Sequence, residues 1–407
     1  MKNFENAKRK GALLLDGATG TNLYLRGLPE GVCVEKWIAE HPEAILDLQK
    51  GFAAAGSDVV YAPTFGANRI KLSHFGLSDE VEALNKTLVG LSKQAAPGCY
   101  VAGDMSPTGC FIEPFGDKSL DEIVACYTEQ AKALNEAGVD LFIIETMMSL
   151  SEARAAVLAC RDFGKPVFVT ITVDENGKTL TGASLANVIV VLQELGVTAC
   201  GINCSCPPAV VKQYILAAQQ VAKIPMIVKP NAGKPDPEHP GQYDMTPEKR
   251  AADMKELVES GISIIGGCCG NTEAHIAALR GMLDGAEIPD LKPHSEQEIL
   301  LADESRLYRL TPGEITFSEE FACDDDLLDN LMDAADEEVD CALIRVETPE
   351  EAQILAQETA QVRLPVCIVS EDAEALERAL YLYNGRAMGK TDLDFDLSRY
   401  GAVKYED

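Results

Sequence analysis

Two short runs of the sequence carry cysteines in an arrangement that can hold a metal ion. Gly-Ile-Asn-Cys-Ser-Cys occupies positions 201–206, and Gly-Gly-Cys-Cys-Gly occupies 266–270. Three thiolates, from Cys204, Cys268 and Cys269, with one open coordination position are typical of a catalytic zinc site. Zinc would hold a substrate thiol as its thiolate near neutral pH, where a free thiol with a pKa of about 8.5 is mostly protonated. Such a thiolate can attack an activated methyl group.

The alternative role for any one cysteine is that of a small buried hydrophobic residue. We prefer that interpretation for the isolated cysteines, which are Cys99, Cys126, Cys160, Cys200, Cys341 and Cys367. We do not prefer it for the adjacent pair at 268–269, because the two glycines before the pair allow a tight turn that lets both thiols face one metal. Cys206 could replace Cys204 as a ligand, but it lies further into the loop and is interpreted as a bystander.

The elements that precede these runs must position them. The first 280 residues alternate short apolar runs with helical stretches, which is the pattern of a parallel sheet with crossover helices. Eight strands are predicted, over 12–16, 58–62, 100–104, 140–145, 167–173, 199–203, 225–229 and 262–266. Eight parallel strands close a barrel whose active site lies at the C-terminal strand ends. The cysteines after the sixth and eighth strands can therefore converge on one face.

Helices are predicted between the strands, among them 80–93, 120–136, 151–162 and 246–260. Glycines follow several helical stretches, at Gly138, Gly164, Gly196 and Gly261, as is common after a helix C-terminus. The alternative fold is an open doubly wound sheet. That fold normally carries a phosphate-binding GxGxxG loop after its first strand, and Asp-Gly-Ala-Thr-Gly-Thr at 16–21 does not match it. The predicted class is α/β, a (β/α)8 TIM barrel followed by a small C-terminal α/β module.

Three segments are predicted along the chain: the barrel over 1–290, a linker over 291–310 and the small module over 311–407. Residues 284–310 are polar and lose the hydrophobic period, which is typical of a linker. In the module, helices are predicted over 326–337, 349–360 and 373–383, and strands over 340–346 and 365–370.

Composition excludes several classes of partner. The 407 residues include 65 acidic and 35 basic ones, a formal net charge of −30, so the surface should repel phosphate backbones and anionic lipid. No apolar run approaches the roughly 18 residues of a membrane span. Thirteen cysteines, an odd number, do not resemble a disulfide framework. We expect a cytoplasmic protein that binds neither nucleic acid nor membrane.

Five runs together resemble the homocysteine S-methyltransferase family, over about residues 10–285. Besides the two cysteine runs they are Asp-Gly-Ala-Thr-Gly-Thr at 16–21, Thr-Phe-Gly-Ala-Asn-Arg at 64–69 and Ile-Glu-Thr at 144–146. The chain is most similar to the homocysteine-binding domain of cobalamin-dependent methionine synthase, because of residues 64–72 and 180–182. The resemblance implies zinc on Cys204, Cys268 and Cys269, with the homocysteine sulfur at the fourth position.

The resemblance also implies the contacts of the amino-acid part of homocysteine. Asp16 and Glu145 would bind its ammonium group, and backbone amides near Ala18 and Thr64 would receive its carboxylate. Asn203, next to a ligand, would orient the site, as residues behind zinc ligands often do. Taken alone, Asp16 or Glu145 could equally be a strand-end cap or a surface ion pair.

The methyl donor is less well defined by the sequence. The family resemblance implies transfer from methylcobalamin, which we expect on a separate corrinoid protein. The alternatives are S-methylmethionine or S-adenosylmethionine as donor, another small thiol as acceptor, or a protein that binds homocysteine without turnover. Residues 364–390 weakly resemble part of a pterin-binding barrel, although Val369 and Gly389 or Lys390 replace the expected Asp and Asn. The module is therefore interpreted as a truncated remnant of that fold.

Overall fold

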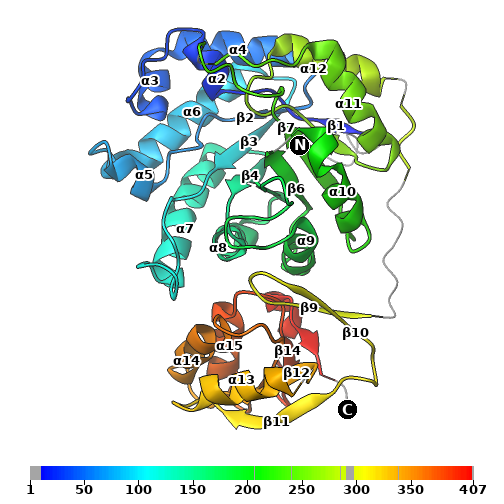
Figure 1. Ribbon diagram of the computed structural model, residues 1–407. Coiled ribbons are helices and arrows are strands. Elements are labelled where there is room, and N and C mark those ends of the chain that lie inside the picture. The colour runs from blue at the N-terminus through cyan, green and yellow to red at the C-terminus, as the bar shows by residue number, and fades with distance from the viewer. Residues whose placement is uncertain are drawn as a thin grey trace.

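The computed structural model describes residues 11–205, 207–239, 241–284, 286–289, 298–337 and 339–405. Its larger sheet has eight parallel strands in the order β1-β8-β7-β6-β5-β4-β3-β2. A parallel bridge between Leu15 and Val59 joins β1 to β2 and closes the sheet. The strands are β1 (Leu13–Leu14), β2 (Val59–Tyr61), β3 (Tyr100–Met105), β4 (Leu141–Met147), β5 (Val167–Ile171), β6 (Ala199–Cys204), β7 (Met226–Pro230) and β8 (Ile264–Ile265). The predicted (β/α)8 barrel is confirmed (Figure 1).

Helices surround the barrel (Figure 1). They are α2 (Gly20–Tyr24), α3 (Val34–Glu40), α4 (Pro42–Ala54), α5 (Arg69–Ser73), α6 (Val81–Ala95), α7 (Leu120–Ala137), α8 (Leu150–Cys160), α9 (Leu185–Glu194), α10 (Pro208–Gln219), α11 (Pro247–Glu259) and α12 (Glu273–Leu283). The glycine at each predicted helix end has a positive φ, for example 77° at Gly138 and 106° at Gly261. Among the described residues, no helix combines the length and the apolar character that crossing a membrane requires.

The barrel core follows from alternation along the strands. Inward side chains form one apolar cluster, which includes Leu13, Val59, Ile143, Phe168 and Ile227. The intervening residues, such as Leu14 and Phe142, face the helices and belong to the larger cluster around the barrel. Because a parallel strand in a barrel is covered on both faces, its sequence reads as a continuous apolar run. This is why the eight strands could be located from sequence.

The C-terminal part contains a second parallel sheet with its strands in chain order, β11-β12-β13-β14-β15. These are β11 (Phe317–Ala322), β12 (Cys341–Arg345), β13 (Val366–Val369), β14 (Met388–Lys390) and β15 (Val403–Lys404), with helices α13 (Leu327–Asp336), α14 (Glu351–Thr359) and α15 (Ala373–Leu382). The three predicted helices and two predicted strands are present. One face of the sheet packs against the helices, and Ile344 and Ile368 belong to that face.

A β-hairpin covers the other face of the small sheet. β9 (Ile299–Ala302) pairs antiparallel with β10 (Leu307–Leu310), and Leu301 and Leu310 pack against Cys341 and Cys367. The hairpin lies in the second half of the segment predicted as a linker, where the polar turn at 303–306 hides the two short strands. Residues 290–297 of that segment lie outside the described residues, and the boundaries at 290 and 310 stay predictions.

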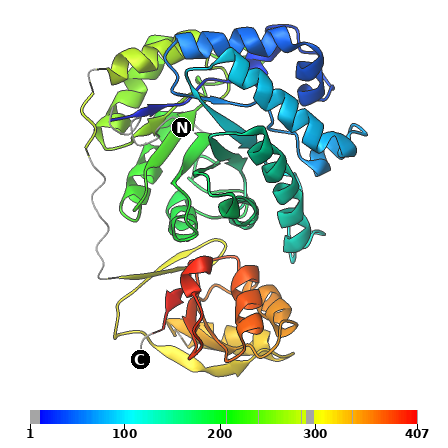
Figure 2. The same cartoon turned by 180° about the vertical axis from the view of Figure 1, so that it is seen from behind.

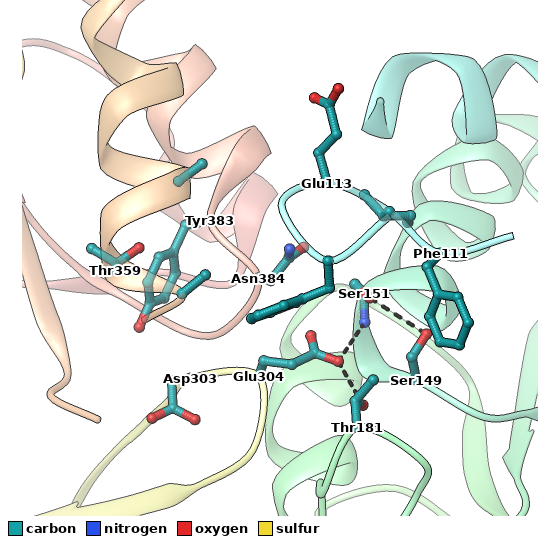
Figure 3. A pocket seen from close by; sticks show the side chains of 14 residues that line it. Phe111, Glu113, Ser149, Ser151, Thr181, Asp303, Glu304, Thr359, Tyr383 and Asn384 are labelled. Atoms are coloured by element: carbon teal, nitrogen blue, oxygen red, sulfur yellow. Dashed lines mark hydrogen bonds between the residues drawn. The ribbon is translucent and has the colours of Figure 1, made fainter. Parts of the chain in front are cut away.

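The hairpin packs against α9 of the barrel, and α15 of the C-terminal part contacts α8 (Figures 1 and 2). Arg154 of α8 is fully buried, and its Nη1 and Nη2 donate to the carbonyl oxygens of Tyr381 and Leu380 at 2.7 and 2.6 Å. Glu304, in the hairpin turn, points toward Thr181 and Ser151 (Figure 3). Its Oε1 accepts hydrogen bonds from Thr181 Oγ1 at 2.8 Å and from two amides at the start of α8. Buried polar contacts thus join the two parts.

Candidate metal centre and substrate site

The barrel brings the three predicted metal ligands together at the C-terminal ends of its strands. Cys204 is the last residue of β6, while Cys268 and Cys269 follow β8. The Sγ of Cys204 lies 2.8 Å from that of Cys268 and 4.0 Å from that of Cys269, and all three sulfur atoms lie within 4.8 Å of one another. Cys204 and Cys268 are 64 residues apart in sequence, yet their thiols meet because both lie at strand ends on the same face of the barrel. Cys206 lies outside the described residues.

The backbone around the thiols adopts conformations that are rare outside glycine. Cys204, Ser205 and Thr146 have φ values of 49°, 57° and 62°. Such residues cost about 1–3 kcal/mol each and persist where surrounding contacts hold them, often at functional sites. Here the hydroxyl of Ser205 accepts a hydrogen bond from the amide of Val173 at 2.9 Å. The β5–α9 loop therefore supports the turn that presents Cys204.

The glycines before the cysteine pair also provide space, a reason that the tight turn expected from sequence does not include. A Cβ on Gly267 would lie 2.3 Å from Cβ of Asn271, and one on Gly266 would lie 2.8 Å from Cβ of Leu15. Neither glycine is among those with positive φ. Asn271 in turn donates to the carbonyl oxygen of Cys268 at 2.8 Å, so this close approach fixes the loop that carries the pair.

The thiols share protons through mutual hydrogen bonds. Hydrogen bonds from Cys204 and then Cys268 lower the pKa of Cys269 to about 3, with a further contribution from Tyr243. The same bonds raise the pKa of Cys204. A thiolate is thus favoured at Cys269. Tetrahedral zinc with bonds of about 2.3 Å to sulfur places its thiolates about 3.8 Å apart. The separation of Cys204 from Cys269 is close to that value, and that of Cys204 from Cys268 is about 1 Å shorter. Three sulfur donors within 4.8 Å of one another are a ligand set that zinc takes.

A layer of polar side chains lies above the apolar barrel core. The inward alternation on β3, β4, β6 and β7 continues to Asp104, Glu145, Asn203 and Lys229, all at most 7 % exposed. The Nζ of Lys229 lies 3.4 Å from Oε2 of Glu145. Four strands therefore contribute ionisable or amide groups to the same interior end of the barrel.

Asp16, which follows β1, belongs to the same layer. It is 1 % exposed, its Oδ2 accepts a hydrogen bond from the amide of Tyr61 at 2.8 Å, and its Oδ1 lies 3.7 Å from Nζ of Lys229. Burial raises the pKa of Asp16 and of Glu145 to about 7, although the charge of Lys229 opposes that rise. The surface ion pair considered for these two carboxylates is thereby excluded, whereas the bond to Tyr61 gives Asp16 a strand-end role as well.

Asn203 links the carboxylates to the thiols. Its Oδ1 accepts a hydrogen bond from the amide of Thr146 at 2.9 Å, and its Nδ2 donates to Oγ1 of the same residue at 2.7 Å. Longer contacts from Nδ2 reach Glu145 Oε2 at 3.4 Å and Cys268 Sγ at 3.8 Å. These contacts support the orienting role expected of Asn203, which stays a prediction.

The backbone amides of Ala18 and Thr64 are already engaged. The amide of Ala18 donates to the carbonyl oxygen of Asn271 at 3.1 Å, and that of Thr64 donates to the carbonyl oxygen of Ala62 at 2.7 Å. The hydroxyl of Thr64 donates to the carbonyl oxygen of Asp104 at 2.8 Å. Their role toward a substrate carboxylate stays a prediction.

Sequence reasoning missed Lys229 and gave Asp104 no role. The signal was present, because Lys229 ends the otherwise apolar run Met-Ile-Val and occupies an inward position two residues after Ile227. Asp104 likewise occupies an inward position two residues after the inward Ala102. The isolated cysteines named above as structural residues are all buried, as expected.

The fold and the site together define a class of protein, the TIM barrels that carry three convergent cysteines at the C-terminal face. The family model for homocysteine S-methyltransferase matches residues 13–283. The chain belongs to the homocysteine S-methyltransferase family, and the resemblance seen in its motifs is confirmed.

Two curated relatives are methionine synthases. The protein of Mycobacterium tuberculosis is 30% identical over 320 residues, which are 73% of this chain and 26% of that protein. The protein of Mycobacterium leprae is 31% identical over 284 residues, 64% of this chain and 23% of the relative. The chain therefore spans about a quarter of the length of these relatives.

Solved structures of the homocysteine methyltransferase MmuM from Escherichia coli share the barrel fold. Its metallated form superposes with a TM-score of 0.58 at 23% identity and covers 68% of this chain and 98% of that one. Its oxidized form gives a TM-score of 0.57 at 24% identity and covers 67% and 97%. At these identities the likeness shows the fold alone.

Proposed function

We propose that the chain binds one zinc ion through Cys204, Cys268 and Cys269 and transfers a methyl group to the thiol of homocysteine, giving methionine. The observation that carries this proposal is the convergence of three thiols beside two buried carboxylates at the mouth of the barrel. Family membership supports the acceptor. When bound, zinc supplies the Lewis acidity that keeps an acceptor thiol deprotonated near neutral pH.

The residues of the chain bind and orient the acceptor. Asp16 and Glu145 would receive its ammonium group through charge-assisted hydrogen bonds, which are stronger than neutral ones. Asn203 bonds both polar atoms of its side-chain amide to Thr146 and thus holds the end of β4 next to Glu145. The closed apolar layer below excludes water from the inner side of the carboxylates, which strengthens their pull on a cation.

The proposed donor is a methyl-corrinoid protein acting in trans, because the curated relatives are methionine synthases and the motif resemblance is to the cobalamin-dependent kind. The five parallel strands of the C-terminal sheet follow chain order, as consecutive units of a barrel do, which supports the proposal that this module is a truncated pterin-binding remnant. Free thiols at the site require a reducing compartment, so a cytoplasmic location is part of the proposal.

The test combines metal content with acceptor binding. Zinc is measured by elemental analysis in the wild type, in Cys204→Ser and in the control Cys200→Ala, whose thiol is buried four residues earlier on the same strand. We expect about one zinc per chain in the wild type and the control, loss of zinc in Cys204→Ser, and homocysteine binding that requires the metal. Homocysteine binding that is independent of zinc would overturn the proposed chemistry.

The donor is tested with the zinc-loaded protein. Homocysteine is offered together with methylcobalamin, S-methylmethionine or S-adenosylmethionine, and methionine formation is measured. Methionine formation with methylcobalamin but not with the two sulfonium compounds supports the proposed donor. Methionine formation with a sulfonium compound instead would make that compound the donor. Zinc and homocysteine binding without transfer from any of the three would make the chain a homocysteine-binding protein.

A further inference from the structure

Lys229 is a buried cation with few short contacts. Its side chain is 4 % exposed, and Nζ lies 3.4 Å from Glu145 Oε2, 3.7 Å from Asp16 Oδ1 and 3.8 Å from the centre of the Tyr61 ring. A charge-assisted hydrogen bond between an ammonium and a carboxylate is about 2.7–2.9 Å long. Within the described part of the chain, the three N–H donors of this ammonium group therefore make only long contacts.

The surrounding carboxylates are also incompletely satisfied. Three of them, Asp16, Asp104 and Glu145, are buried around a single lysine. Oδ1 of Asp16 and Oδ1 of Asp104 have no hydrogen-bond partner among the described residues. Buried charges and polar atoms left in this state are costly, so their presence together indicates that a ligand completes the hydrogen bonding. Three carboxyl groups around one ammonium group offer more acceptor oxygens than Lys229 uses, so a second cation can bind to them.

A ligand that supplies both a cation and an anion matches these unused groups. The ammonium group of an amino acid can donate to the free carboxylate oxygens, while its carboxylate can accept from Nζ of Lys229. The amides of Ala18 and Thr64, the alternative partners for that carboxylate, already donate to carbonyl oxygens of the chain. Lys229 projects from the end of β7 into the same polar layer as Asn203, which contacts Cys268. An amino acid bound there therefore lies beside the thiol cluster.

We propose that Lys229 binds the α-carboxylate of the acceptor and that Asp104 joins Asp16 and Glu145 around its ammonium group. Lys229 is thus the residue that makes the site specific for a zwitterionic amino-acid thiol. This inference rests on the proposed function for the identity of the acceptor. The opposing interpretation is that Lys229 permanently fills the ammonium position, in which case the site prefers a thiol without an amino group.

The test measures binding of three thiols to the zinc-loaded protein by calorimetry. Homocysteine carries both charged groups, 3-mercaptopropylamine lacks the carboxylate, and 4-mercaptobutyrate lacks the amino group. In the wild type we expect homocysteine to bind most tightly. In Lys229→Met we expect homocysteine affinity to fall about 10- to 100-fold, because one charge-assisted hydrogen bond is lost, while 3-mercaptopropylamine changes less than about threefold. In the variant, homocysteine should then bind no more tightly than expected for a ligand without its α-carboxylate.

Two further variants keep the outcome interpretable. Lys229→Arg retains a cation and should keep homocysteine ahead of 3-mercaptopropylamine, even if Lys229→Met folds poorly. Lys71→Met is the control, since Lys71 is a partly buried lysine on α5 that contacts Ser106 and the Phe65 ring instead of the carboxylates. It should leave the preference for the carboxylate unchanged.

Each remaining outcome is decisive. Equal losses for homocysteine and 3-mercaptopropylamine in Lys229→Met would reduce Lys229 to a structural counter-ion and overturn the inference. Tightest wild-type binding of 4-mercaptobutyrate would establish the opposing interpretation. A wild type that binds none of the three thiols would overturn the inference and the proposed acceptor together. Thiol binding as expected, without methyl transfer from any donor, would contradict the proposed activity and leave the inference about Lys229 intact.

Discussion

Buried charges occur in two places in this molecule, and they are satisfied differently. At the interface between the barrel and the C-terminal sheet, Arg154 makes hydrogen bonds of 2.6 and 2.7 Å, and the partly buried Glu304 accepts a hydrogen bond of 2.8 Å and two longer ones through Oε1. Nε of Arg154 and Oε2 of Glu304 have no partner among the described residues, so the contrast with the mouth lies in the short hydrogen bonds. At the barrel mouth, Lys229 comes no closer than 3.4 Å to a carboxylate, and Asp16 retains an unpartnered oxygen. The difference separates polar groups that the chain fixes with short hydrogen bonds from charges whose short hydrogen bonds are left for a ligand.

The physical reason is the cost of burial. Removing a charge from water costs several kcal/mol and is repaid by close, well-directed hydrogen bonds. At the interface the chain supplies at least one short hydrogen bond to each charge. At the mouth it supplies only longer contacts to Lys229, so a bound ligand can make the short hydrogen bonds that the protein lacks there. The four predictions below test this contrast, beginning with the largest effect.

Replacing Arg154 should damage stability but leave the metal site intact. Arg154→Ala removes two charge-assisted hydrogen bonds to carbonyl oxygens at the interface, and we expect the free energy of unfolding to fall by about 4 kcal/mol. Urea denaturation measures the loss, and elemental analysis should still find one zinc per chain. The control Arg69→Ala, which removes an exposed pair with Glu129, should cost less than about 1 kcal/mol. Zinc loss in Arg154→Ala would show that the two regions are not separate.

Glu304 should make stability depend on pH. Burial raises its pKa from 4.5 to about 7, so the folded state holds the proton more tightly than the unfolded chain. The stabilisation of the folded state by protonated Glu304 is fully present below about pH 4.5 and is lost as the pH rises through 7. Glu304→Gln should therefore be more stable than the wild type at pH 8, by at most about 3 kcal/mol, and similar at pH 4. Unfolding curves at both pH values decide this, and exposed Glu298→Gln is the control.

The mouth carboxylates should make ligand affinity depend on pH. Burial raises the pKa of Asp16 and Glu145 to about 7, so raising the pH from 6 to 8 deprotonates them and favours a bound ammonium. For 3-(methylthio)propylamine, which has no thiol and stays protonated in this range, affinity should rise about tenfold per carboxylate. Calorimetry measures the change. A flat profile in the wild type would mean that neither carboxylate contacts the ammonium.

The smallest effect belongs to an exposed ion pair across the same interface. Arg378 of α15 donates to both carboxylate oxygens of Asp121 on α7, at 2.7 and 3.0 Å. Because the pair is exposed to solvent, Arg378→Ala should lower the free energy of unfolding by less than about 1 kcal/mol, and salt should weaken the difference. A loss as large as that expected for Arg154→Ala would contradict the assignment of the interface energy to buried contacts.

The barrel itself could be predicted because its strands are covered on both faces. Runs such as residues 141–144 are apolar throughout, and glycines such as Gly138 mark the helix ends that precede them. The hairpin at 299–310 escaped because its strands are four residues long and its turn is polar. Its stability comes from packing between two sheets, and a local pattern does not reveal such packing.

The amino-acid sequence by itself determined the eight strands, the helices between them and the three candidate ligands, because these follow from local periodicity and from cysteines placed at strand ends. The tertiary structure alone decided which side chains share the barrel mouth. Lys229 and Asp104 are ordinary residues in sequence and become neighbours of Asp16 and Glu145 only when the sheet closes. Their charges then interact because a closed barrel keeps water away from them.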